Sequence, residues 1–284
     1  EDQKQRWLPA ACRGEINFCF AITEATAGTN SIKINTLARA NGNRFSMSGS
    51  KTFITGADVC DYALVVARTT PHGEVKRKTD GFTLFIVDLN AKGVERHPID
   101  INLPIPESQF TIFFDEVDLG LENVIGEVGR GFDILFDSLN PERILVAALC
   151  CGIGRFALEK AVAYASEREV FDVPIGSHQG VQHPLAAAKT QVEMASLMMR
   201  QAAWQYDQGL PAGEASNMAK YAGAEAGIQA VDAALQAHGG NGFTEDYGIY
   251  ELYPMVRLMR TAPVNREIIL SYIGEKVMGL PRSY

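Results

Sequence analysis

The chain has 284 residues, of which 46% are apolar and 21% are charged. These proportions are typical of a folded globular protein, and they exclude a disordered chain, a collagen-like chain and a small disulfide-stapled domain. At about 100–200 residues per domain, the length predicts two domains. The 34 acidic and 26 basic residues give a formal net charge of -8, which argues against a general nucleic-acid-binding protein.

The cysteines and histidines form no recognisable disulfide or metal motif. The cysteines are Cys12, Cys19, Cys60, Cys150 and Cys151. They are odd in number and none are spaced as Cys-x-x-Cys, so we expect free thiols in a reducing compartment. The five histidines include no His-Glu-x-x-His, and no metal site is predicted. The sequence has no run of about 18 apolar residues, so no membrane span is predicted.

The first eight residues, Glu-Asp-Gln-Lys-Gln-Arg-Trp-Leu, read as the middle of a helix. They contain no initiator methionine and no signal-peptide pattern. We interpret the start as a cut end, with any targeting segment outside the sequence. The expected location is the cytoplasm, or the mitochondrial matrix if the source is eukaryotic.

Between about residues 16 and 125 the sequence consists of short runs rich in β-branched and aromatic residues. Runs such as Tyr62–Ala67 and Phe82–Val87 are separated by turn signals such as Asn41-Gly42 and Asp80-Gly81. This spacing favours an antiparallel β sandwich or barrel. No long helical pattern interrupts the runs, so a doubly wound parallel sheet is not expected.

From about residue 126 the pattern changes to long helices. Asn140-Pro141 is a helix-start signal, with Asn as the N-cap and Pro in the first turn. The predicted helices run from this signal towards residue 164, from 181 to 208, from 213 to 237, and from Pro263 to near Gly279. Four amphipathic segments with short connections predict a four-helix bundle. The predicted fold class is therefore α+β, with the sheet domain first and the bundle second.

Two strand ends combine an apolar or aromatic residue, a hydroxyl and a glycine. They are Ile22-Thr23 with the following Gly28-Thr29, and Phe53-Ile54-Thr55-Gly56. One interpretation is an ordinary polar turn after a strand. The other is the mouth of a ligand site, where hydroxyls and exposed backbone N–H groups bind a flat heterocycle or a thioester tail.

Three features of the helical half also have two interpretations. Arg168 either complements a helix C-terminus or clamps a pyrophosphate. Gly239-Gly240 follows a helix instead of a strand, so it is no dinucleotide-binding fingerprint; it is either a helix C-cap or a place where backbone approaches a ligand. Glu142, taken alone, is a first-turn carboxylate that favours the helix dipole.

Four motifs occur in a fixed order along the chain. They are Ile22-Thr23-Glu24 with Ala27-Gly28-Thr29-Asn30, Lys51-Thr52-Phe53-Ile54-Thr55-Gly56, the segment from Arg168 to Gln182, and the segment from Gln236 to Phe243. In order and spacing they resemble the motifs of the acyl-CoA dehydrogenase family over essentially the whole chain. The sequence departs from the family at Asn30, Phe53 and Asp172, where Asp, Trp and Gly are usual.

The resemblance implies an N-terminal helical domain, a central β domain and a C-terminal four-helix bundle, with FAD as the cofactor. It places the end of a truncated N-terminal helical domain at residues 1–15, the β domain at 16–125 and the bundle at 126–284. It further implies a homo-oligomer, a dimer or a tetramer, in which a neighbouring subunit contributes to the FAD site. An electron-transfer flavoprotein is the expected acceptor, and fatty acid metabolism the expected context.

The resemblance also assigns cofactor and substrate residues. The positions expected to contact FAD are Ile22, Thr23, Thr29, Phe53, Thr55, Arg168, Phe171, Gln179, Gln236, Gly239, Gly240 and Asn265. Arg143 matches a position near the CoA moiety of the substrate.

The sequence also departs from the family pattern at the position of the catalytic base, and this departure decides which residue is predicted to be the base. Many family members carry it in Tyr-Glu-Gly-Thr near the end of the chain, but here the aligned run is Ala262-Pro263-Val264-Asn265, and proline cannot accept a proton. A branch that includes isovaleryl-CoA and long-chain enzymes places a Glu at the start of the first bundle helix instead. Leu139-Asn140-Pro141-Glu142-Arg143 matches the pattern of that branch, so Glu142 becomes the predicted base.

The predicted reaction is FAD-dependent α,β-dehydrogenation of an acyl-CoA thioester to the trans-2-enoyl-CoA. Glu142 removes the α-proton while the β-hydrogen leaves as a hydride to flavin N5. Two alternatives stay open: an acyl-CoA oxidase that reoxidises with O2, and a non-catalytic partner subunit of a heteromeric enzyme. The sequence does not indicate the length or type of the acyl chain.

Overall fold

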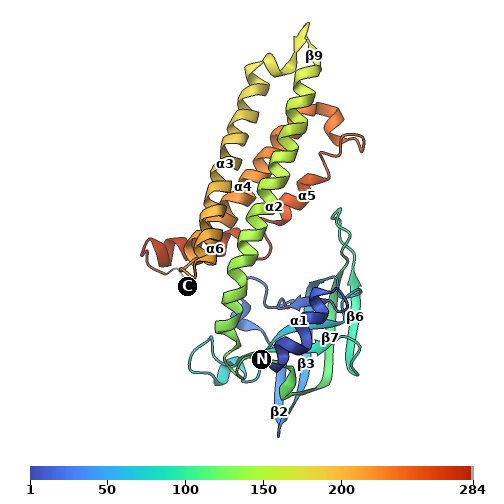
Figure 1. Cartoon of the computed structure of the whole chain (residues 1–284), viewed down its shortest axis with the longest axis vertical. Coiled ribbons are helices and arrows are strands. Elements are labelled where there is room, and N and C mark those ends of the chain that lie inside the picture. Colours follow the sequence, from blue (N-terminus) through green and yellow to red (C-terminus); the bar gives the residue numbers. More distant parts are fainter. Residues whose placement is uncertain (283–284) are drawn as a thin grey trace. The chain divides into compact units, whose positions relative to one another are not determined.

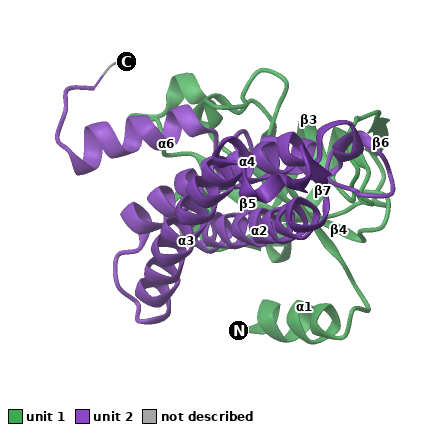
Figure 2. Ribbon diagram, turned by 90° about the horizontal axis from the view of Figure 1, so that it is seen from above, with its two compact units in different colours: residues 1–136 green, residues 137–284 purple. Residues whose placement is uncertain are grey.

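The computed structural model describes residues 1–282, with the side chains of residues 136 and 137 excepted. The chain divides into two compact units, residues 1–136 and residues 137–284 (Figure 2). The first carries the sheet and the second the helices, as predicted from the change in sequence pattern. None of the described helices is both long enough and apolar enough to cross a bilayer. The predicted domain limits at residues 15 and 125 stay predictions.

The first unit is built on one mixed sheet. Its strands are β1 (Phe18–Ala21), β2 (Leu37–Asn41), β3 (Arg44–Thr55), β4 (Tyr62–Arg68), β5 (Phe82–Asp88), β6 (Val94–Ile99), β7 (Gln109–Gly120) and β8 (Val124–Ile125). They pair in the order β6-β7-β3-β2-β4-β5-β8, and β1 pairs with β4. Side chains that alternate along β3 and β7 form a core with Met47, Ile112 and Phe85 fully buried.

The helix α1 (Asp2–Cys12) belongs to the first unit. It is anchored by Trp7, whose ring meets Tyr62 edge-on at 4.7 Å between centroids. The side chain of Gln3 donates to the carbonyl of Val124 at 2.6 Å. These contacts hold α1 to the sheet unit.

Three long helices form the body of the second unit: α2 (Gly131–Glu167), which begins in the first unit, α3 (Gln179–Asp207) and α4 (Gly213–His238) (Figure 1). The hairpin of β9 (Glu169–Val170) and β10 (Val173–Pro174) joins α2 to α3. Two short helices follow, α5 (Leu252–Leu258) and α6 (Arg266–Tyr272), and a π-helical turn completes the series at Ile273–Val277.

Small residues set the spacing of the long helices. A Cβ added to Gly223 of α4 would lie 2.9 Å from the Cα of Ala147 on α2, closer than real Cβ atoms approach. A Cβ added to Gly154 of α2 would lie 3.0 Å from a side-chain methyl group of Val192 on α3. The helix cores are accordingly rich in buried alanine. Close packing of backbones therefore fixes α2 against α4.

The structure corrects five details of the predicted fold, two in the sheet and three in the helices. The sheet is open, because its path of pairing within residues 1–282 ends at β6 and at β8; it is also mixed, because β1 and β2 pair parallel to β4. Long connections from β1 and β2 to β4 permit this, whereas hairpins permit only antiparallel neighbours.

The helix start predicted at Asn140-Pro141 is wrong, because α2 begins at Gly131 and Pro141 lies inside it. The last predicted helix is interrupted: α6 ends at Tyr272 and gives way to the π-helical turn. α5 was not predicted.

Candidate active site

A β-bulge in β3 presents Phe53 to solvent. The register between β3 and β7 shifts between Lys51 and Ile54, and Phe53 within it has a φ of 55°. Its side chain is 61% exposed. Such bulges re-aim side chains beside functional sites. Two residues on, the side-chain amide of Gln109 donates to Thr55 Oγ1 at 2.9 Å and so orients this hydroxyl.

The segment after β1 lies beside the same strand. The backbone N–H of Thr52 donates to the carbonyl of Thr23 at 2.9 Å, and Lys51 Nζ donates to the carbonyl of Ile22 at 2.9 Å. The structure therefore brings together two of the predicted flavin-contacting segments, residues 22–23 and 53–55. Thr29, further along the same loop, is exposed.

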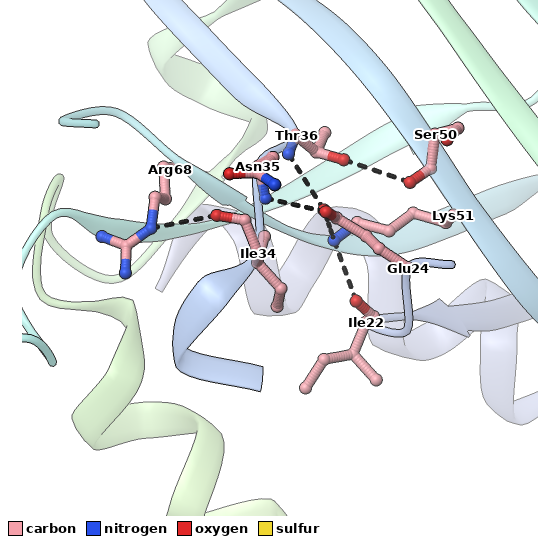
Figure 3. A network of polar contacts seen from close by, with 8 residues as sticks. All are labelled: Ile22, Glu24, Ile34, Asn35, Thr36, Ser50, Lys51 and Arg68. Atoms are coloured by element: carbon pink, nitrogen blue, oxygen red, sulfur yellow. Dashed lines mark hydrogen bonds and ion pairs between the residues drawn. The ribbon is translucent and has the colours of Figure 1, made fainter. Parts of the chain in front are cut away.

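Behind these segments, Glu24 and Lys51 form a buried ion pair with 2.9 Å between Nζ and Oε1 (Figure 3). Burial raises the pKa of the Glu24 carboxyl, but the Lys51 charge and the N–H groups of Asn35 and Thr36 outweigh it, so the net pKa is below its ordinary value. Burial lowers the pKa of the Lys51 ammonium to about 8, against the opposing effect of Glu24. The surroundings thus favour the carboxylate form of Glu24, while the Lys51 ammonium gives up its proton more readily than an exposed lysine.

In the second unit, Glu142 lies on α2 about three turns after the helix begins. Burial raises the pKa of its carboxyl, and the positive charge of Arg143 only partly offsets that effect. The guanidinium of Arg143 is buried, and its Nη1 donates to Asn140 Oδ1 at 3.1 Å. A carboxyl with a raised pKa, beside a cation, is suited to accept a proton from a weak carbon acid.

Lys220 of α4 lies among the same group of side chains. It is 1% exposed, and burial lowers its pKa to about 8, with Arg143 contributing in the same direction. Its Nζ donates to the carbonyl of Val264 at 2.5 Å. Lys220 thereby fixes the segment around Pro263.

A cavity of about 350 Å³ in the second unit gathers four of the predicted cofactor residues. Arg168, Gln236, Gly239 and Gly240 line it, together with Tyr164, Val170, Ile175, Ala237, His238 and Asn241. The rings of Tyr164 and His238 stack at 4.5 Å between centroids. Gly239 has φ 56° and ψ -133°, a conformation that only glycine adopts readily, and a Cβ on either glycine would meet nothing within 4 Å. The cavity thus exposes backbone at an open rim, beside an arginine.

The remaining predicted residues of this unit lie outside that cavity. Phe171 is 86% exposed at the tip of the β9–β10 hairpin, with a φ of 56°. Gln179 is the first residue of α3, and Asn265 is the N-cap of α6, where its Oδ1 accepts from the N–H of Ile268 at 2.9 Å. In residues 1–282 no cluster of three His, Cys, Asp or Glu side chains could hold a metal ion.

Comparisons with known proteins agree with these features. The family model described as the acyl-CoA dehydrogenase middle domain matches residues 19–117, and that of the acyl-CoA dehydrogenase C-terminal domain matches residues 129–278. The chain belongs to the acyl-CoA dehydrogenase family. These oxidoreductases dehydrogenate acyl-CoA thioesters, and the family uses FAD.

Individual relatives extend the match to almost the full chain. The acyl-CoA dehydrogenase FadE12 of Mycobacterium tuberculosis is 46% identical over 100% of this chain and 73% of its own length. The caffeyl-CoA reductase-Etf complex subunit CarC of Acetobacterium woodii is 32% identical over 97% of this chain and 73% of its own. The structure of butyryl-CoA dehydrogenase from Megasphaera elsdenii superposes with a TM-score of 0.92 at 28% identity, covering 98% of this chain and 72% of that one.

The residues present fit FAD in each unit taken by itself. The first offers the exposed aromatic ring of Phe53 at a bulge of β3, the strand that also carries Thr55 and that pairs through the Thr52 N–H with the carbonyl of Thr23. The second offers the guanidinium of Arg168 and open glycine backbone at one cavity. Flat rings stack on aromatic side chains, and phosphate oxygens accept from guanidinium and backbone N–H groups.

Sequence reasoning assigned no role to Glu24, Lys51 or Lys220. Glu24 and Lys51 each belong to one of the motifs on which the resemblance rests, and this was the sequence signal that could have pointed to a role for them. Their contact joins positions 27 residues apart, and no local pattern predicts it. Lys220 lies on the alanine-rich face of a helix. A lysine among small residues was the one feature of the sequence that could have pointed to it.

Proposed function

We propose that this acyl-CoA dehydrogenase family member oxidises an acyl-CoA to the trans-2-enoyl-CoA, with Glu142 as the base that removes the α-proton. The observation that carries the proposal is the environment of Glu142. Its carboxyl has a pKa raised by burial, while the alternative family position for the base is Pro263. A second carboxylate is not needed, because the reaction requires one general base.

The proton step needs two aids, since the α-proton of a thioester is a weak acid. Further loss of water around Glu142 when the acyl chain binds raises its pKa towards that of the substrate. Hydrogen bonds to the thioester carbonyl stabilise the developing enolate charge. When bound, FAD supplies the acceptor for the β-hydride. Arg143, one residue further along α2, is proposed to act near the CoA moiety.

The FAD-binding residues are proposed in two groups. Ile22, Thr23, Thr29, Phe53 and Thr55 contact the flavin end, and Arg168, Phe171, Gln179, Gln236, Gly239, Gly240 and Asn265 hold the phosphates and the adenosine. The cavity at Arg168 and Gly239 supports the second group. The bulge at Phe53 supports the first.

The spacing along α2 supports a homo-oligomer, a dimer or a tetramer. From residue 142 to residue 168 the chain advances by roughly 40 Å at 1.5 Å per helical residue. One cofactor that places its reactive ring near Glu142 would need to be long to reach Arg168 of the same copy. Sharing the site between copies removes this difficulty. An electron-transfer flavoprotein is the proposed acceptor, as the name of the Acetobacterium relative suggests for that protein.

The alternatives are separated by their products. An acyl-CoA oxidase produces hydrogen peroxide during turnover in air, and a dehydrogenase does not. A non-catalytic partner subunit binds FAD substoichiometrically or shows no reduction by any acyl-CoA. The raised pKa of Glu142 favours a catalytic chain, because a subunit without chemistry has no use for a destabilised carboxylate.

The experiment is anaerobic bleaching of the flavin by short, branched, long and ring-bearing acyl-CoAs, using the full-length protein. Ring-bearing compounds are included because one relative is named a caffeyl-CoA reductase subunit. Rapid loss of the oxidised flavin band with one class would establish the half-reaction and identify the substrate group. Bound flavin that none of these compounds reduces would contradict the proposed function.

A further inference from the structure

The buried pair of Glu24 and Lys51 lies next to the segment proposed to contact the flavin. Lys51 is 0% exposed and Glu24 is 6% exposed. Burying two charges costs hydration that their attraction only partly returns, and two apolar side chains of similar volume often stabilise a fold equally well. Fold stability alone therefore does not explain why ions are buried here.

Lys51 acts on the backbone as well as on Glu24. Its Nζ donates to the carbonyl of Ile22, and the N–H of Thr52 donates to the next carbonyl, that of Thr23, both at 2.9 Å. The peptide between residues 22 and 23 is trans. In a planar trans peptide the C=O and the N–H point in opposite directions, so holding the carbonyl of Ile22 towards Lys51 holds the Thr23 N–H away from it.

Glu24 fixes the far end of the same loop. Its Oε2 accepts from the N–H of Asn35 at 2.7 Å, and its Oε1 accepts from the N–H of Thr36 at 2.9 Å. The hydroxyl of Thr36 then donates to the carbonyl of Ser50 at 3.3 Å. One carboxylate thereby ties the loop at both ends, and the lysine ties it to β3.

A third buried charge supports the loop from β4. The guanidinium of Arg68 is 1% exposed, and it donates to the carbonyls of Ile34 at 3.1 Å and Ile32 at 2.6 Å. Its charge also acts favourably on Glu24. Arg68 holds the middle of the loop through carbonyls alone, whereas Glu24 and Lys51 reach the residues proposed to contact the flavin.

We propose that Glu24 and Lys51 are positioning residues for the flavin, which hold the Ile22–Thr23 peptide in its binding orientation before the cofactor arrives. The inference rests on the proposed function, since it requires that this peptide contacts FAD. A donor that is ordered in advance costs less entropy on binding. Loss of the pair is therefore expected to weaken FAD binding by at least tenfold.

The test is a double-mutant cycle on the full-length protein, with Lys51→Met, Glu24→Gln and the double variant. The melting temperature of the FAD-free protein and the Kd for FAD are measured for each. Each single change leaves unbalanced polarity in the interior and lowers the melting temperature, and the double change restores most of it. If the pair positions the flavin segment, the double variant still binds FAD at least tenfold more weakly.

A double variant with normal stability and normal FAD affinity would overturn the inference and leave the proposed function intact. A wild-type protein that binds no FAD would overturn both. The control is Arg44→Met, which breaks the exposed ion pair of Arg44 with Asp118 between β3 and β7. That variant is expected to keep its melting temperature and its Kd.

A measurement on the wild-type protein tests the inference even when the variants do not fold. Hydrogen exchange of the Asn35, Thr36 and Thr52 amides is followed in the FAD-free protein, since these donate to Glu24 and to the carbonyl of Thr23. Protection equal to that of the β3 core before FAD is added is expected. Fast exchange that slows only after FAD binds would contradict advance positioning.

Discussion

Two carboxylates, one in each unit, are withdrawn from water, Glu24 fully and Glu142 in part, and their pKa values are shifted in opposite directions. Glu24 faces Lys51 and two backbone N–H groups, and its pKa lies below the ordinary value. Glu142 has the charge of Arg143 nearby, yet burial dominates and its pKa lies above the ordinary value. Burial alone does not decide the shift; the donors that surround the carboxylate do. The satisfied carboxylate orders a loop, and the less satisfied one is available for a proton.

The largest expected effect distinguishes Glu142 from other glutamates of the same helix. Glu142→Gln should retain FAD and ligand binding but lose about three orders of magnitude or more in flavin reduction, because an essential base is removed. Stopped-flow reduction by acyl-CoA measures this. Glu159→Gln, at an exposed position of α2, is the matched control and should reduce at the wild-type rate. Near-normal reduction by Glu142→Gln would refute the assignment.

The next effect concerns the packing that supports Glu142. Gly223→Ala places a Cβ against the backbone of Ala147, one turn after Arg143, and should lower the free energy of unfolding by about 1–3 kcal/mol. Gly152→Ala, on an exposed part of α2 with nothing within 4 Å, should raise it by about 0.5–1 kcal/mol. Urea unfolding measures both. Equal changes in the free energy of unfolding for the two variants would show that close helix packing does not fix α2.

The pH dependence of flavin reduction should follow the ionisation of Glu142. The base works only when ionised, so the rate should fall tenfold for each pH unit below its pKa. Because burial raises that pKa above 4.5, the fall should begin at a higher pH than for an exposed Glu. Single-turnover rates across the acid range test this. A rate that stays constant down to pH 4.5 would contradict the raised pKa.

The smallest effect is on stability. A folded-state pKa above the unfolded value means that the folded chain binds more protons between the two, so the contribution of Glu142 to stability is present below pH 4.5 and is lost as the pH rises through the raised pKa. Glutamine does not ionise, so the Glu142→Gln variant does not lose this stability as the pH rises. Its free energy of unfolding should exceed that of the wild type at pH 7 and match it below pH 4.5. The reverse order at pH 7 would mean that Glu142 is stabilised as an anion.

Sequence patterns predicted the order of the two units and the long helices. The helix expected at 181–208 is observed at Gln179–Asp207, because its apolar period and flanking glycines are local signals. The start predicted for α2 is wrong, because proline is favoured in the first turn of helices whereas Pro141 lies inside this one. The parallel pairing of β1 with β4 could not be predicted, because it depends on strands 44 residues apart.

The candidate site was predictable where it depended on residue identity and not where it depended on contacts. The resemblance predicts that Ile22, Thr23, Phe53 and Thr55 contact the flavin, which stays a prediction, and the structure brings the segments that carry them side by side. The left-handed backbone at Phe53 had no signal, because an aromatic residue rarely adopts it. The buried partners of Glu24 likewise come from tertiary packing that a linear pattern does not contain.

The length of α2, 37 residues, leads to a prediction for genetic complementation. Glu142 lies near the start of the part of α2 that belongs to the second unit, and Arg168 directly follows the last residue of the helix. If copies share each cofactor as proposed, a chain altered at Glu142 and a chain altered at Arg168 have separate defects in separate halves of a site. Mixed assemblies of the two would then contain some sites built from intact halves. Co-expression of two inactive alleles should restore part of the activity that neither allele has alone.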